Sequence, residues 1–130
     1  MTILITGGAG FIGSNFVHTW LEKNNEPLVN LDLLTYAGNL ENLQKFENDA
    51  RHIFIKGNIV NKSLINEIFS RYNPRAIINF AAESHVDKSI SSPDEFIQTN
   101  IVGTYNLLIC ANKYYDGLSK EIKENFKYIQ

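Results

Sequence analysis

A glycine-rich turn near the N-terminus restricts the fold of this chain more than any other feature. It follows a short apolar run at residues 2–6 and precedes apolar residues at helical spacing over residues 11–24. Within the turn the spacing is G-x-G-x-x-G after one further glycine, and its members are Gly7, Gly8, Gly10 and Gly13. Glycine allows a tight turn and a close approach of the backbone to a diphosphate, and the first helical amides attract anions. Strand, turn and helix in this order predict a dinucleotide-binding unit.

An acidic residue supports the same interpretation. Asp32 ends a second apolar run at residues 28–32, and it lies 19 residues after Gly13. A carboxylate at this place can accept hydrogen bonds from ribose hydroxyls, and it repels a 2′-phosphate. The next three residues supply no Arg that could hold such a phosphate. The sequence therefore predicts NAD, in preference to NADP, as the cofactor.

The rest of the chain alternates short apolar runs with helical patterns. Further strands are expected at 52–56, 76–82 and 126–130, and helices at 41–46, 64–72, 92–115 and 119–125. Ser92, Pro93 and Glu95 have the spacing of a capping box at the start of the long helix. The alternation predicts an α/β fold: a Rossmann-type doubly wound parallel sheet, truncated after about five strands, in one domain over residues 1–130.

Composition excludes several other classes of protein. A net charge of −2 on 130 residues does not suit an electrostatic nucleic-acid binder, and no apolar run approaches the length of a membrane span. The single cysteine, Cys110, excludes a disulfide framework and fits a cytoplasmic location. Glu83, His85 and Asp87 alternate as metal ligands can, but no second ligand cluster accompanies them, so no metal is expected. The 16 asparagines are interpreted as a composition bias without functional meaning.

Three segments carry a more specific signal. Residues 32–40, with Leu-Thr-Tyr-Ala-Gly-Asn, residues 81–90, with Ala-Ala-Glu-Ser-His-Val-Asp, and residues 99–104 resemble the extended short-chain dehydrogenase/reductase superfamily. Within it they are most similar to the nucleotide-sugar 4,6-dehydratases, and the resemblance covers essentially the whole chain. It implies conversion of dTDP-glucose to dTDP-4-keto-6-deoxyglucose in deoxysugar (rhamnose-type) biosynthesis. The implied steps are oxidation at C4, elimination of water and return of the hydride to C6.

The resemblance also implies a set of NAD-binding residues. These are Gly7, Gly10, Phe11, Ile12, Gly13, Asp32, Leu33, Leu34, Thr35, Gly38, Asn58, Ile59, Phe80, Ala81, Ala82, Glu83, Ser84 and Thr99. Ser84 is expected to reach the sugar nucleotide as well. The family usually has Asp at the position of Asn58, and a basic residue is common at that of Leu33. Asn58 keeps a carbonyl acceptor, so cofactor binding is expected to survive the first departure.

The catalytic pair of the family is not found in this sequence. A Tyr-x-x-x-Lys pair drives the first step there, because the Lys lowers the pKa of the Tyr. No tyrosine of this chain has Lys four residues later, so no catalytic residue is assigned. In the family the catalytic Thr-Asp-Glu segment begins just after the fifth strand. We therefore expect this chain to be the cofactor-binding part of the enzyme, lacking the catalytic segment and the substrate domain, and without turnover of its own.

Two alternative functions and one candidate protein partner remain to be considered. The chain can belong to another NAD-dependent nucleotide-sugar epimerase or dehydratase, or it can be a non-catalytic NAD-binding sensor module. The helix from Ser92 to Tyr115 carries more apolar positions than one buried face needs. Either later parts of a longer chain cover it, or two subunits pair through it. The resemblance favours a homodimer of the complete protein.

Overall fold

Five parallel strands form a single sheet in the order β3-β2-β1-β4-β5 in this computed structural model, which describes residues 1–35 and 38–130. Tyr36 and Ala37, which belong to the dehydratase-like segment 32–40, lie outside the described residues. The strands are β1 (Thr2–Thr6), β2 (Leu28–Asp32), β3 (His52–Lys56), β4 (Pro74–Asn79) and β5 (Lys127–Ile129). The chain winds outward from β1 in both directions, so the doubly wound Rossmann-type fold is confirmed.

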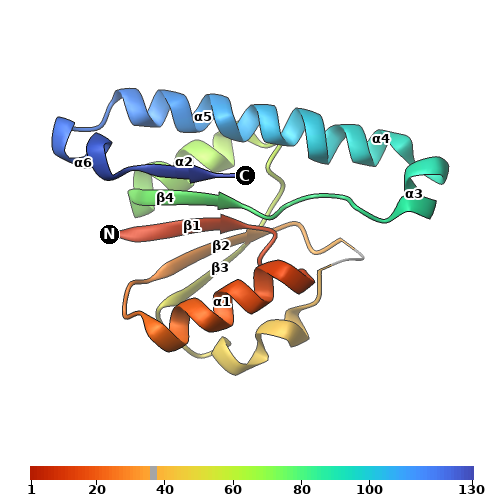
Figure 1. Cartoon of the computed structure of the whole chain (residues 1–130), viewed down its shortest axis with the longest axis horizontal. Coiled ribbons are helices and arrows are strands. Elements are labelled where there is room, and N and C mark those ends of the chain that lie inside the picture. The colour runs from red at the N-terminus through yellow and green to blue at the C-terminus, as the bar shows by residue number, and fades with distance from the viewer. Residues whose placement is uncertain (36–37) are drawn as a thin grey trace.

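Helices cover both faces of the sheet (Figure 1). One face carries α1 (Phe11–Lys23) and the 3₁₀-helix η1 (Leu40–Phe46), and the other carries α2 (Lys62–Tyr72) and α5 (Thr104–Asp116). The remaining helices are α3 (Val86–Ser91), α4 (Pro93–Phe96), the π-helix η2 (Ile97–Gly103) and α6 (Lys120–Asn125). Within the described residues no helix has both the length and the apolarity needed to cross a membrane.

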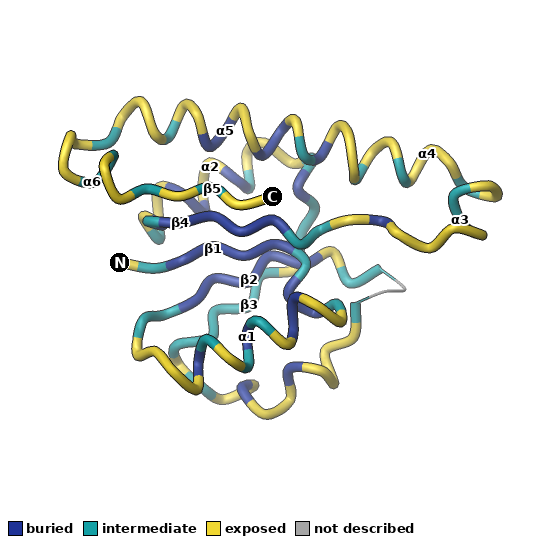
Figure 2. Tube along the Cα trace, viewed as in Figure 1, coloured by how far each residue is buried: buried dark blue, intermediate teal, exposed yellow. Residues whose placement is uncertain are grey.

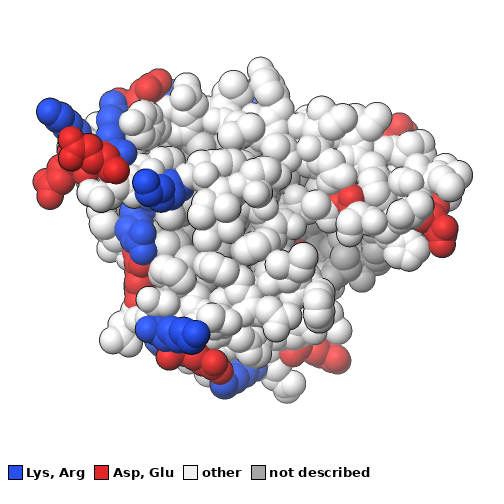
Figure 3. All heavy atoms as spheres, in the orientation of Figure 1, with Lys and Arg blue, Asp and Glu red and all other residues white. Residues whose placement is uncertain are grey.

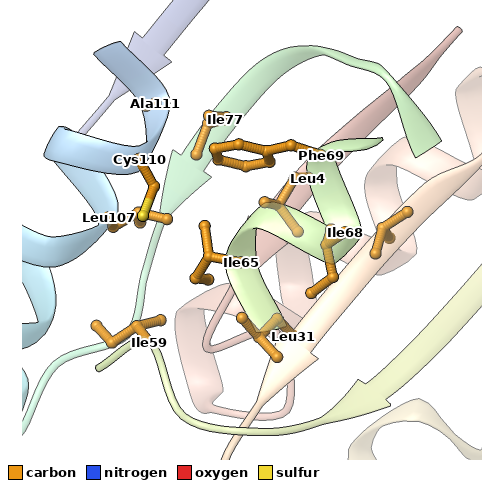
Figure 4. Packing of buried hydrophobic residues seen from close by; sticks show 11 residues of the cluster. Leu4, Leu31, Ile59, Ile65, Ile68, Phe69, Ile77, Leu107, Cys110 and Ala111 are labelled. Atoms are coloured by element: carbon orange, nitrogen blue, oxygen red, sulfur yellow. The ribbon is translucent and has the colours of Figure 1, made fainter. Parts of the chain in front are cut away.

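The sheet separates two hydrophobic cores. Successive strand residues point to opposite faces, so Leu4 packs toward α2 and α5, whereas Ile3 and Ile5 pack toward α1. Figure 4 shows the first core, in which Leu107 and Cys110 of α5 meet the sheet and α2. This burial on both faces explains why the central strands are continuously apolar in the sequence, and Figure 2 shows them as the most buried part of the chain.

Two sequence predictions about the ends of elements are wrong. The fourth strand ends at Asn79 and not at residue 82, because the Ala81 amide turns to donate to the Thr6 hydroxyl at 3.3 Å and leaves the ladder. The capping box at Ser92 does not form. That residue ends α3, where its amide donates to the Lys88 carbonyl, and its side chain makes no capping bond to α4. The helix α3 itself was not predicted.

The long helix is not uniform either. Its middle third, η2, has π-helical hydrogen bonding, and the helix continues on both sides as α4 and α5. Such widened turns commonly occur at functional sites. Gly103 lies at the end of η2, where a Cβ would come within 2.6 Å of the Ile59 side chain. The glycine therefore lets the helix approach the loop that follows β3.

Two adjacent leucines of α5 test the assignment of its buried face. Leu107 is fully buried, whereas Leu108 is 44% exposed. We expect Leu107→Ala to lower the free energy of unfolding by about 3 kcal/mol, because it leaves a cavity in the core. The matched control Leu108→Ala is expected to cost less than about 1 kcal/mol. Urea denaturation of both variants measures the difference, and equal losses would contradict the buried face described here.

Candidate functional site

An open cleft lies at the carboxyl ends of the strands. It opens beside β1 and β4, from which the chain leaves the sheet in opposite directions, and ligands of open α/β sheets bind at such points. Figure 3 shows the surface hollowed between the part that carries α4 and the part that carries α1. Charged side chains gather mainly at the other end of the molecule, which carries α6.

Most residues of the predicted set line this cleft. They are Gly7, Gly10, Asp32, Leu33, Thr35, Gly38, Asn58, Ile59, Phe80, Ala81, Ala82, Glu83 and Thr99. Leu31 and Gly57 also line it and were not predicted. The other predicted residues, Phe11, Ile12, Gly13, Leu34 and Ser84, do not form its walls. Leu34 packs instead against the core beneath α1, and Ser84 is exposed on the loop that follows β4.

The glycine loop is packed so tightly that two of its members cannot carry a side chain. Gly7 has a φ of +72°, and a Cβ there would lie 2.6 Å from the backbone nitrogen of Ala81. A Cβ on Gly13 would overlap the Gly7 carbonyl oxygen. The loop therefore touches both the end of β4 and the first turn of α1, which is the close packing that the glycine pattern predicted.

Two side chains of β2 hold the loop from below. The Gly8 amide donates to Asn30 Oδ1 at 3.1 Å, and the Ala9 amide donates to Asp32 Oδ2 at 2.8 Å. On the other side, Asn42 Nδ2 donates to the Ala9 carbonyl at 3.0 Å. The amides of Gly8 and Ala9 are consequently engaged within the protein and are not the groups that a ligand would meet.

The first amides of α1 are available instead. Gly10 is the N-cap of this helix, and Phe11 and Ile12 are its first two residues, whose amides have no acceptor within the helix. The side chains of Phe11 and Ile12 are 81% and 68% exposed, so they do not cover the helix end. Free amides together with the positive end of the helix dipole form an anion-binding site at the rim of the cleft.

Asp32 is 8% exposed and lies in the cleft wall. Besides the bond from Ala9, its Oδ1 accepts the Leu34 amide at 2.7 Å. An ionised carboxylate has about four acceptor positions, so two bonds leave capacity for a hydroxyl of a ligand. Leu34 itself has a φ of +57°, which is strained for a branched side chain and shows how firmly the carboxylate holds this turn.

The far wall of the cleft is fixed by the long helix. Asn100 of η2 accepts the Glu83 amide through Oδ1 at 2.8 Å, and its Nδ2 donates to the Glu83 carbonyl at 2.8 Å. Asn106 of α5 is buried and donates from Nδ2 to the Ile59 carbonyl at 2.6 Å. Glu83 Oε2 is also buried, and it has no hydrogen-bond partner among the described residues.

Sequence reasoning missed the residues that hold these walls. Asn30, Asn42, Asn100 and Asn106 each bind the backbone of a segment that lines or supports the cleft. The interpretation of the asparagines as mere composition bias is therefore wrong for this group. A usable signal existed for Asn30, because a polar residue inside an otherwise apolar strand needs a buried hydrogen-bond partner.

Comparison with known proteins agrees with this architecture. The family model described as GDP-mannose 4,6 dehydratase matches residues 4–130. The dTDP-glucose 4,6-dehydratases of Salmonella typhimurium and Escherichia coli are both 49% identical over 128 residues, which is 98% of this chain and 36% and 35% of theirs. The chain thus spans about a third of the length of these curated relatives.

Solved structures lead to the same group of proteins. The dTDP-glucose 4,6-dehydratase of Streptomyces venezuelae, crystallised with NAD, is 43% identical and superposes with a TM-score of 0.83 over 88% of this chain and 36% of that one. The UDP-glucose 4-epimerase of Thermotoga maritima, solved with UDP-glucose, is 35% identical with a TM-score of 0.77, over 88% of this chain and 35% of that one. Since the family model matches nearly every residue and the relatives share the fold, the chain belongs to the GDP-mannose 4,6-dehydratase family.

Proposed function

We propose that this chain is the NAD-binding part of a nucleotide-sugar 4,6-dehydratase. The observation that carries the proposal is the division among the loop amides: those of Gly8 and Ala9 are held by β2, which leaves those of Phe11 and Ile12 free at the cleft. None of the described residues that line the cleft is Lys or Arg. Binding of a diphosphate there therefore depends on backbone amides and the helix dipole.

The residues on either side of this end fit the rest of NAD. Asp32 retains acceptor capacity for a ribose hydroxyl, and the described residues that line the cleft around it include no Lys or Arg to hold a 2′-phosphate. Across the cleft, Glu83 lines the opposite wall. NAD, when bound, supplies the acceptor and the donor of the hydride. The residues of this chain bind and orient the cofactor.

We infer that the substrate is dTDP-glucose. Identity of 49% to dehydratases that carry this name, against 35% to the epimerase, supports a dehydratase over an epimerase. Ser84, exposed on the loop beside Glu83, is the residue that we assign to the sugar nucleotide. Because the sequence has no Tyr-x-x-x-Lys pair, this part of the enzyme contributes cofactor binding and not the proton transfers. The proposal includes a cytoplasmic location, which the single cysteine supports.

The exposed apolar face of the long helix supports pairing of two subunits, which is a further part of the proposal. Its outer face exposes Ile97, Ile101, Tyr105, Leu108 and Ile109. Contiguous exposed apolar residues mark surfaces that another protein or another part of the same protein covers. We propose that a second copy of the complete enzyme covers them, and that the π-helical segment lies within or next to this interface.

Titration with NAD and with NADP tests the proposed cofactor. We expect calorimetry to show binding of NAD at least about tenfold tighter than binding of NADP, because the 2′-phosphate would approach the Asp32 carboxylate without a compensating cation. Equal affinities would contradict the assignment of Asp32 to the ribose. Absence of binding to either nucleotide by the folded chain would contradict the proposed function itself.

A proline at the first position of α1 tests the role of the free amides. Phe11→Pro removes one N–H without disturbing the helix, since Pro suits the first helical position and Gly10 is already extended, with φ −74° and ψ 177°. We expect this change to weaken NAD binding about tenfold, the effect of one charge-assisted hydrogen bond. The control Phe11→Ala removes the same side chain but keeps the amide, and it is expected to change the affinity less than about threefold.

Light scattering tests the pairing of subunits. We expect the complete enzyme to be a dimer, and Ile101→Lys to produce a monomer, because a charge would be buried in the apolar interface. The control Leu40→Lys replaces an exposed residue of η1, on the opposite side of the sheet, and should leave the dimer intact. A monomeric wild-type enzyme would contradict this part of the proposal.

A further inference from the structure

A line of hydrogen bonds runs from the glycine loop through the interior to a histidine. The Gly8 amide donates to Asn30 Oδ1 at 3.1 Å, and Asn30 Nδ2 lies 3.3 Å from His52 Nε2. Asn30 is completely buried, so it has no solvent with which to replace a lost partner.

The direction of each bond follows from the groups at its two ends. An amide N–H only donates, so the oxygen of Asn30 faces Gly8 and its NH₂ group faces His52. Since the NH₂ group of Asn30 faces Nε2 at 3.3 Å, this nitrogen must accept, and the proton of the neutral imidazole is on Nδ1. His52 Nε2 then carries a lone pair, which accepts a hydrogen bond from Asn30 Nδ2. The line is complete only when the imidazole is neutral.

Protonation of His52 places a second donor against the NH₂ group of Asn30. Two facing donors repel. If the Asn30 amide rotated by half a turn, its oxygen would face His52, but its NH₂ group would then face the Gly8 N–H, which is again a pair of donors. In either case the Gly8 amide or the imidazole loses its acceptor in a buried place, which is costly. Gly8 lies two residues before the N-cap of α1, so the loop beside the free amides is the part that gives way.

We propose that Asn30 and His52 are positioning residues, which hold the glycine loop in its nucleotide-binding shape only while His52 is neutral. The proposal rests on the proposed function, because it concerns affinity for the same cofactor. Its consequence is a weakening of NAD binding on acidification. Neither side chain lines the cleft, so the effect is transmitted through the loop.

The surroundings of His52 allow it to titrate. Burial is the main influence and lowers the pKa of the imidazole below its ordinary value, and the charge of His18 acts in the same direction. Asp49 and the Phe46 carbonyl oppose this shift, although the Asp49 carboxylate is itself paired with Arg51. Since the pKa is lowered, the neutral form and its bonds are present above pH 6.5 and are lost as the pH falls through the pKa of the folded protein.

Solvent reaches the ring from one side. His52 lines a second hollow beside η1, together with Glu41 and Glu47, and it is only partly buried there. The partly exposed ring can therefore take up a proton from solvent without unfolding of the chain.

NMR titration of the His52 ring locates its pKa, and calorimetry of NAD binding at pH 8 and at a pH about one unit below that pKa measures the effect. We expect the Kd to rise about fivefold at the lower pH, the effect of one hydrogen bond. His52→Gln keeps an acceptor for Asn30 at every pH, so its Kd should match the wild type at pH 8 and should not rise. His18→Gln is the matched control and should keep the pH dependence, because the His18 ring donates to the Asn42 carbonyl in either charge state.

A second measurement does not depend on NAD. Asn30→Asp keeps an oxygen for Gly8 and turns a carboxylate toward His52, so NMR titration of the ring should show a higher pKa than in the wild type. For the same reason its NAD affinity should no longer fall at the lower pH. Circular dichroism verifies that each variant is folded at both pH values.

The outcomes separate the two proposals. Failure to bind NAD at pH 8 would contradict the proposed function, while the NMR titration would still decide whether Asn30 and His52 are coupled. Binding at pH 8 with an unchanged Kd at the lower pH, where NMR shows the ring to be protonated, would overturn the inference alone. So would a pH dependence that persists in His52→Gln, or an affinity that rises on acidification through attraction of the charged ring for the diphosphate.

Discussion

The glycine loop keeps its shape because two neighbouring side chains of β2 bind its amides. Asn30 accepts from the Gly8 amide and Asp32 accepts from the Ala9 amide, and both acceptors belong to a strand that is paired on both sides. The loop cannot relax without leaving buried polar groups unsatisfied. The free amides of α1, the close contact with the end of β4 and the opening of the cleft all follow from this attachment.

The opposite wall depends on a similar use of amide side chains. Asn100 offers Glu83 both a donor and an acceptor, as the backbone of an adjacent strand would. The segment after β4 has left the sheet, so this pairing replaces the ladder that it lost. The π-helical turn brings Asn100 to that segment, and Asn106 fixes the loop after β3 from the same helix. One long helix thereby sets the width of the cleft.

Much of this could be predicted from the sequence, and the reasons are specific. A strand buried on both faces has a continuous apolar sequence, so the position of β1 was predicted correctly. The glycine spacing is typical of few other structures, so the turn and Asp32 were correctly expected at one cleft. The end of β4 and the cap of α4 depended on Thr6 and on Lys88, which are distant or belong to an unpredicted helix. Asn42, Asn100 and Asn106 were missed because they lie on helices and bind backbone groups, which leave no mark in a residue pattern. Only Asn30, inside an apolar strand, offered a signal.

Under the proposed function, attachment of the loop to β2 also determines how much the protein must rearrange when a nucleotide binds. The donors at the head of α1 are aligned when the chain folds, since the strand holds the turn that precedes them. Little conformational entropy is then lost when the nucleotide binds. The affinity is therefore largely determined by the conformation of the protein before binding. A change that destabilises the central sheet, even far from the cleft, would therefore weaken nucleotide binding before it causes unfolding.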